Sequence, residues 1–229
     1  TDSDVIVNGL LTTTNPGVVT ITADDSVTIS GTGSIRVFGA GSVSVTSNTA
    51  ATNGNSNDGI TMAGASSVET DSGTITLQST GANGGDITAQ TLTTLNALVT
   101  INSGAGVALQ NAVTTRGANV AIDAVGGVAS TAAGDISTAG TALNQNSGLV
   151  DINAGGTVNL QGDIITSGFG GTSNGGLVTI DTLNGSITVA VINASGAAAG
   201  NGANILLNAD GTDSDVIVNG LLTTTNPGV

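Results

Sequence analysis

Residues 19–35 read VTITADDSVTISGTGSI and contain the pattern that decides the fold. Aliphatic residues alternate with Thr in two short runs, separated by a turn with two aspartates and followed by a glycine-rich turn. Alternation with a period of two is typical of strands with one buried face, and Asp, Ser and Gly favour turns. Strands this short cannot bury their apolar faces alone, so the stretch predicts one turn of a larger repetitive structure.

The same pattern recurs along the whole chain. A Val-x-Ile spacing aligns the sequence in eight registers, 21 to 32 residues apart. The position two residues after each start is aliphatic, and the position two residues before it is Gly or Ala. Gly or Ala suits a bend in which a side chain would clash or φ is positive. The eight starts are Val19, Val43, Ile75, Val99, Val120, Val150, Val178 and Ile205.

A polar column runs beside the inward-facing aliphatic positions. If the registers stack at one strand spacing, these side chains are expected to form a ladder of amide and hydroxyl hydrogen bonds at a turn. A row of ligand-facing side chains is the alternative interpretation. The column consists of Thr22, Thr46, Gln78, Asn102, Asp123, Asn153, Asp181 and Asn208.

Most registers contain a second and a third short apolar stretch, such as Val27 with Ile29 and then Ile35 with Val37. Three strands in each 21 to 32 residues predict an all-β fold, a right-handed parallel β-helix of about eight rungs. Gly-, Asn- and Ser-rich insertions are expected to form surface loops on this column. They are residues 48–59, 141–148 and 168–176.

The two ends of the chain have the same sequence. Residues 212–229 repeat residues 1–18, TDSDVIVNGLLTTTNPGV, at all eighteen positions with an offset of 211. The spacings between the eight registers, continued into the next copy, also add up to 211. We therefore interpret residues 1–229 as a single β-helix segment, one 211-residue tandem repeat plus the first 18 residues of the next. Because neither end has a polar cap, head-to-tail association with neighbouring copies is expected.

Composition narrows the choice of partners. The chain has 16 acidic residues against two arginines, Arg36 and Arg116, and its net charge is −14. Such a charge disfavours nucleic acid and anionic membranes, and no apolar run reaches the roughly 18 residues of a membrane helix. With 36 Gly and only two Phe the chain resembles a disordered one in composition, but the regular alternation argues against disorder.

The residue types present argue against an enzyme. The chain has no His, Lys, Cys or Tyr, which leaves only carboxylates and hydroxyls as general bases or nucleophiles. Asp24 and Asp25 are adjacent, but we expect them in the turn after Ala23 rather than as a catalytic pair. Ice binding needs an unbroken flat array of Thr, and Asp151 and Leu206 interrupt the corresponding row. No catalytic residue is predicted.

One acidic cluster suggests a metal site. Asp210, Asp213 and Asp215 follow one another closely around Gly211. Several carboxylates at short spacing are typical ligands of Ca²⁺, so these three residues predict a Ca²⁺ site, the only cofactor expected. A solvated turn is the alternative, since Asp and Gly are also common turn residues.

Three stretches resemble the repeats of filamentous-haemagglutinin-type adhesins and related giant bacterial surface proteins. They are residues 19–35, residues 150–168 (VDINAGGTVNLQGDIITSG) and residues 178–189 (VTIDTLNGSITV). The resemblance implies a stiff β-helical shaft that holds an adhesive or effector region away from a bacterial cell, on the cell surface or secreted. The alternative is a module that binds a glycan or a cell-surface protein through one solenoid face or a loop such as residues 48–59.

Overall fold

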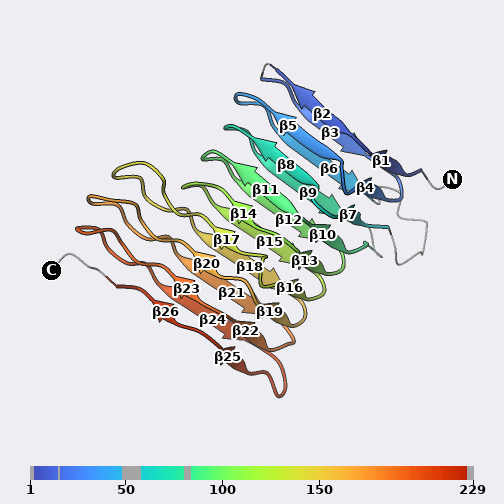
Figure 1. Cartoon of the computed structure of the whole chain (residues 1–229). Helices are drawn as coiled ribbons and strands as arrows, with labels where there is room; N and C mark the ends of the chain where they lie inside the picture. The colour runs from blue at the N-terminus through green and yellow to red at the C-terminus, as the bar shows by residue number, and fades with distance from the viewer. Residues whose placement is uncertain (1–2, 15, 48–57, 80–83, 226–229) are drawn as a thin grey trace.

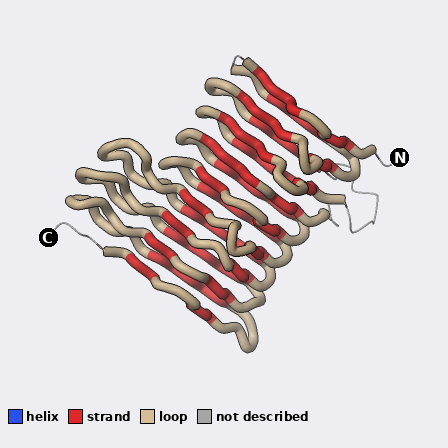
Figure 2. Tube along the Cα trace, viewed as in Figure 1, coloured by secondary structure: helices blue, strands red, loops and turns tan. Residues whose placement is uncertain are grey.

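The computed structural model describes residues 3–14, 16–47, 58–79 and 84–225, and every regular element in these ranges is a β-strand. The strands wind into a column of stacked coils, each of which adds one strand to each of three parallel sheets (Figure 1). Only turns and loops join successive strands (Figure 2). The predicted right-handed parallel β-helix is therefore confirmed. The described ranges contain no helix with the length and apolar character needed to cross a membrane.

Sheet C contains the eight predicted registers. Its strands begin at the eight predicted starts, and each start lies directly opposite the next, from Val19 opposite Val43 to Val178 opposite Ile205. The prediction that the Val-x-Ile registers superimpose is thus confirmed. The strands are β3 (Val19–Thr22), β6 (Val43–Ser47), β9 (Ile75–Ser79), β12 (Val99–Ser103), β15 (Val120–Ala124), β18 (Val150–Ala154), β21 (Val178–Thr182) and β24 (Ile205–Ala209).

The second and third apolar stretches form sheets A and B. Sheet A contains β1 (Val5–Val7), β4 (Val27–Ile29), β7 (Ile60–Met62), β10 (Ile87–Ala89), β13 (Val107–Leu109), β16 (Val128–Ser130), β19 (Val158–Leu160), β22 (Ile187–Val189) and β25 (Val216–Val218). Sheet B contains β2 (Leu10–Thr13), β5 (Ser34–Val37), β8 (Ser67–Thr70), β11 (Thr91–Thr94), β14 (Val113–Thr114), β17 (Ile136–Ser137), β20 (Ile164–Ile165), β23 (Ile192–Asn193) and β26 (Leu222–Thr223).

The core is a continuous stack of aliphatic side chains. In residues 19–35, the side chains of Val27, Ile29 and Ile35 are completely buried. Two coils further on, Ile75 and Leu77 are buried to the same extent. Branched side chains suit this arrangement because they fill the pleat and meet the same kind of side chain one strand spacing, about 4.8 Å, above and below. Stability is therefore the sum of contacts between neighbouring coils.

Glycine lies two residues before several strands of sheet C because the backbones of successive coils come close together there. A Cβ added to Gly73 would overlap the carbonyl oxygen of Gly41, and one added to Gly176 would overlap that of Gly148. Neither Gly73 nor Gly176 has a positive φ. Of the two reasons considered for Gly at this corner, steric exclusion applies at these positions and backbone conformation does not.

A column of buried threonines closes the corner between sheets B and C, and the sequence analysis missed it. Thr94 Oγ1 donates to the carbonyl oxygen of Ala97 at 2.6 Å. The same bond is present where inserted loops make the corner longer. Thr138 Oγ1 donates to the carbonyl oxygen of Gly148 at 2.6 Å, and Thr166 Oγ1 donates to that of Gly176 at 2.7 Å. Each threonine therefore fixes the point at which the chain re-enters sheet C, whatever the length of the loop.

The insertions at this corner stack on one another. The Asn146 Oδ1 atom accepts the backbone N–H of Asn174 at 2.8 Å, and Asn174 Oδ1 accepts that of Asn201 at 2.8 Å. Residues 141–148 and 168–176 lie outside the strands, as predicted, but they form one ordered ridge with residues 195–203 (Figure 1). Of the predicted insertion 48–59, residues 48–57 lie outside the described residues.

Candidate functional site

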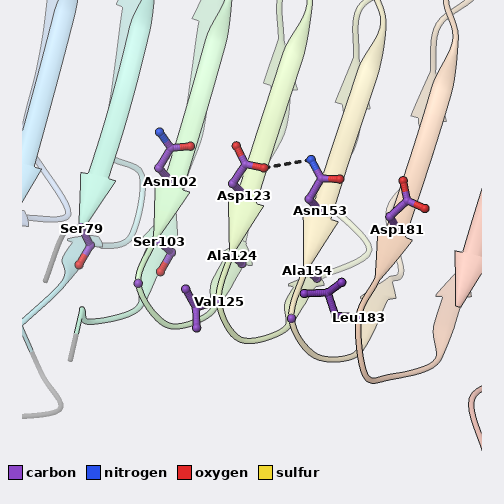
Figure 3. Close-up of a pocket in the computed structure, with 12 residues that line it drawn as sticks. Ser79, Asn102, Ser103, Asp123, Ala124, Val125, Asn153, Ala154, Asp181 and Leu183 are labelled. Carbon is purple, nitrogen blue, oxygen red and sulfur yellow. Dashed lines mark hydrogen bonds between the residues drawn. The ribbon is translucent and has the colours of Figure 1, made fainter. Parts of the chain in front are cut away.

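The predicted polar column lies on the outer face of sheet C. Its members are in register, but they occupy the fourth position of each strand rather than a turn. Among the described members one ladder bond forms, from Asn153 Nδ2 to Asp123 Oδ1 at 3.0 Å (Figure 3). An ionised carboxylate only accepts hydrogen bonds, so an Asp in the column can bond within the row only to a donor, such as the amide of Asn153 beside Asp123. The column is therefore an in-register polar row with one internal bond, not the continuous ladder that was expected.

A groove of about 580 Å³ runs beside this row, at the corner between sheets C and A. Val125 and Leu183 project into solvent, with 71% and 77% of their surfaces exposed. Gly155 lies between them, where a side chain is excluded because its Cβ would overlap the carbonyl oxygen of Val125, so no side chain separates Val125 from Leu183. The lining residues are Ser79, Asn102, Ser103, Gly104, Asp123, Ala124, Val125, Asn153, Ala154, Gly155, Asp181 and Leu183 (Figure 3).

The turns that line the groove are fixed by the same backbone pairing as the strands. The N–H of Val125 donates to the carbonyl of Ser103 at 3.1 Å, and the N–H of Leu183 donates to that of Ala154 at 2.9 Å. The two exposed apolar side chains are thus held two coils apart, about 9.5 Å at the usual strand spacing. A row of amide and carboxylate groups beside aliphatic side chains suits the binding of an elongated ligand more than covalent chemistry.

The structure also locates the predicted acidic residues. Asp24 and Asp25 lie in the bend between β3 and β4, as predicted. Asp210, Asp213 and Asp215 lie in the turn between β24 and β25, where Asp213 has a φ of 60°. In the part of the chain that the structure describes, no three acidic side chains are grouped to hold a metal ion. The Ca²⁺ site stays a prediction: heat in a calorimetric Ca²⁺ titration, lost in Asp213→Asn, would support it, and no heat would contradict it.

The identity of residues 212–229 with residues 1–18 suggests a structural role for Asp215. Asp215 occupies the same position of the repeat as Asp4. Asp4 Oδ1 accepts two hydrogen bonds from the next coil, from the Ser26 N–H at 3.2 Å and the Ser26 hydroxyl at 2.7 Å. In a longer array Asp215 would meet the equivalent serine of the next coil. Linking consecutive coils is thus the alternative to Ca²⁺ for this carboxylate.

The outer face of sheet B has a small charged cluster. Arg36 pairs with Glu69, directly opposite on β8, and its Nη2 lies 3.5 Å from Asp71 Oδ1. The guanidinium also lies 5.0 Å from the centre of the Phe38 ring. Because these charges are partly exposed to water, the pair contributes only about 0.2–1 kcal/mol to stability. The cluster is a surface contact between coils rather than a site.

No family model, no curated protein and no solved structure matches the chain. The column, the groove and the two ends of the repeat are therefore the features from which a function has to be inferred.

Proposed function

We propose that the chain is a structural repeat unit of a stiff, elongated shaft in a giant bacterial cell-surface or secreted fibrous protein, and that its partners are neighbouring copies of the same repeat. The observation that supports this proposal most directly is where the repeated segment lies. In residues 3–14 it forms β1 and β2, and in residues 212–225 it forms β25 and β26. The two copies lie at opposite ends of the column and in the same two sheets.

The two copies pair with different strands: the N-terminal copy pairs with the coil that follows it, and the C-terminal copy pairs with the coil that precedes it. Val5 of β1 lies opposite Val27 of β4, and the equivalent Val216 of β25 lies opposite Ile187 of β22. A following repeat would therefore extend sheets A and B with no change of register. Eight coils at about 4.8 Å add about 40 Å of shaft per repeat.

The column has properties that suit an exposed fibre. Within the described residues it has no hinge between domains, because each coil pairs with the next through all three sheets. The net charge of −14 would keep neighbouring fibres apart in solution. The adhesin-like and extracellular parts of the proposal rest on the resemblance of the three repeat stretches to filamentous-haemagglutinin-type adhesins.

A second candidate function is binding along the groove. Its polar row and its two exposed aliphatic side chains, Val125 and Leu183, would suit a glycan or an extended peptide of a surface protein. A glycan array probed with the chain and with Leu183→Asp tests this function. Hits that the variant loses would support binding, and an array without hits would favour a pure spacer.

The proposed shaft is tested by measuring how the length of the molecule grows with the number of repeats. Proteins of two and four repeats, joined at the 211-residue period, should appear in electron micrographs as straight rods that grow by about 40 Å per repeat. Flexible strings of separate particles would contradict the proposal.

A further inference from the structure

The chain offers a protease that cleaves after basic residues only two peptide bonds. It has no Lys, and its two arginines are Arg36 and Arg116. Arg36 is half-buried in β5, in register between Thr12 of β2 and Glu69 of β8, so its peptide bond lies inside sheet B. A protease needs its substrate as an extended segment with free backbone groups, and a strand that is paired on both sides does not provide one.

Arg116 is the accessible arginine of the two. It is exposed at the corner between β14 and β15, and within the described ranges it forms no ion pair. The φ values of 51° at Arg116 and 110° at Gly117 are left-handed, so the bond between these residues lies in a tight turn. The side chain can therefore reach the specificity pocket of a protease, but the backbone beside it is not extended.

Both polar groups beside the Arg116–Gly117 bond are engaged by the next coil. The carbonyl oxygen of Arg116 accepts the side-chain amide of Gln145 at 2.7 Å. The N–H of Gly117 donates to the carbonyl oxygen of Thr138 at 3.0 Å. The Gln145 amide also lies so close that a Cβ added to Gly117 would overlap it. The bond is thus held on its carbonyl side and on its amide side, and neither group is free for a protease.

Gln145 is itself fixed by its own loop, the insertion of residues 141–148. Its Oε1 atom accepts the N–H groups of Thr141 at 2.8 Å and of Ala142 at 3.0 Å. With the oxygen held in this way, the nitrogen of the same amide is left to donate to the preceding coil. The insertion therefore presents one donor, in a fixed position, to the Arg116 carbonyl.

We propose that the Arg116–Gly117 bond is a latent cleavage site for arginine-specific serine proteases, and that the side chain of Gln145 keeps this site closed. During cleavage the carbonyl oxygen of the reacting bond has to enter an oxyanion hole, where N–H groups of the protease donate to it. Gln145 already donates to this oxygen and lies on the side from which the protease would reach it. The corner must therefore open away from the 141–148 loop before it is cut.

Hydrolysis at this site would cut the chain without separating the column. One water is consumed, the bond between the Arg116 carbonyl carbon and the Gly117 nitrogen breaks, and a carboxylate and an amine remain. The new ends follow β14 and precede β15, and both strands stay paired with the coils on either side. In a tandem array one such bond would recur every 211 residues. The inference thus concerns resistance to proteases and goes beyond the proposed shaft.

Digestion of the folded full chain with trypsin tests the role of Gln145. Mass spectrometry follows the fragments that end at Arg116 and begin at Gly117. Gln145→Ala should release them about tenfold faster than the unchanged chain. Gln145→Glu should have a similar effect, because an ionised carboxylate keeps the acceptor for the loop N–H groups but cannot donate to the Arg116 carbonyl. Gln161→Ala, exposed at another corner, is the matched control and should leave the rate unchanged.

Two further measurements in the same digest separate local opening from general unfolding. The rate of cutting after Arg36 reports general unfolding and should be the same in all variants. Arg116→Asn removes the site and suits the positive φ, so combined with Gln145→Ala it should abolish both fragments. Unchanged cutting in Gln145→Ala, faster cutting in Gln145→Ala but not in Gln145→Glu, or an equal rise after Arg36 would overturn the proposal. None of these results affects the rod-length test of the shaft.

Discussion

At the scale of single residues, the buried hydroxyl groups hold the corners of the coil in place. Thr94 is completely buried, donates to the Ala97 carbonyl at 2.6 Å and accepts the Ala97 N–H at 3.3 Å. A buried backbone group that loses its partner costs more than the bond contributes on balance, because it has no water to turn to. Small polar residues are therefore as much a part of this fold as the aliphatic ones.

Replacement of one such threonine should be costly even though the size of the side chain is kept. Thr94→Val leaves the carbonyl and the N–H of Ala97 without a partner, and we expect a loss of about 1–3 kcal/mol in the free energy of unfolding. Urea denaturation followed by circular dichroism measures the change. Thr93→Val, on the outer face of the same strand, is the matched control and should change stability by less than about 0.5 kcal/mol. Equal effects would contradict the role assigned to the buried hydroxyl.

A core residue should be more costly still. Leu77 of β9 is completely buried between the strands of the neighbouring coils. Leu77→Ala would leave a cavity in a column that cannot easily collapse, and we expect a loss of about 2–5 kcal/mol in the same urea experiment. Thr76→Ala, beside it on the outer face, serves as the control. A loss below 1 kcal/mol for Leu77→Ala would mean that the coils are not tightly packed.

At the scale of elements, the strands were predictable, but the side-chain hydrogen bonds at the corners and the groove were not. The aliphatic alternation in stretches such as residues 19–35 fixed the starts of all eight strands of sheet C, because a shift of one residue would turn every aliphatic side chain outward. The threonine column escaped notice because Thr is also frequent at exposed positions and because insertions separate Thr138 and Thr166 from Gly148 and Gly176. The groove depends on how turns stack, which spacing along the sequence does not reveal.

The asparagine side chains that link the stacked loops should protect backbone amides from hydrogen exchange. Asn174→Ala removes the acceptor of the Asn201 N–H, so the amide of Asn201 should exchange its hydrogen at least several-fold faster. Hydrogen exchange followed by NMR measures the rate. Asn159→Ala, exposed on the outer face of β19, should leave that rate unchanged. Unchanged exchange in Asn174→Ala would mean that the ridge is not held by its side chains.

At the scale of the whole molecule, charge governs how one column meets another from the side. The chain has only two basic residues against 16 acidic ones, and its isoelectric point is about 4.1. Mutual repulsion of the columns therefore depends on ionised carboxylates spread along the whole length.

Acidification should consequently cause lateral association. Near pH 4 the net charge approaches zero and the repulsion between columns disappears, so light scattering should rise steeply and fall again on return to pH 7. At pH 7, addition of about 0.5 M NaCl should produce a weaker effect of the same sign, because salt screens the same repulsion. Scattering that is independent of both pH and salt would show that charge does not keep the columns apart.

The local pairing of each coil with its two neighbours has a consequence for a column that is pulled from its ends. Each coil is held only by the coils directly beside it, and a coil at an end of the column has one such neighbour. Coils should therefore detach one at a time, starting at an end. Each coil that detaches frees 21 to 32 residues, roughly 70–110 Å of extended polypeptide. Such a tether would yield in many small steps under load and rewind when the load is removed, instead of failing at one point.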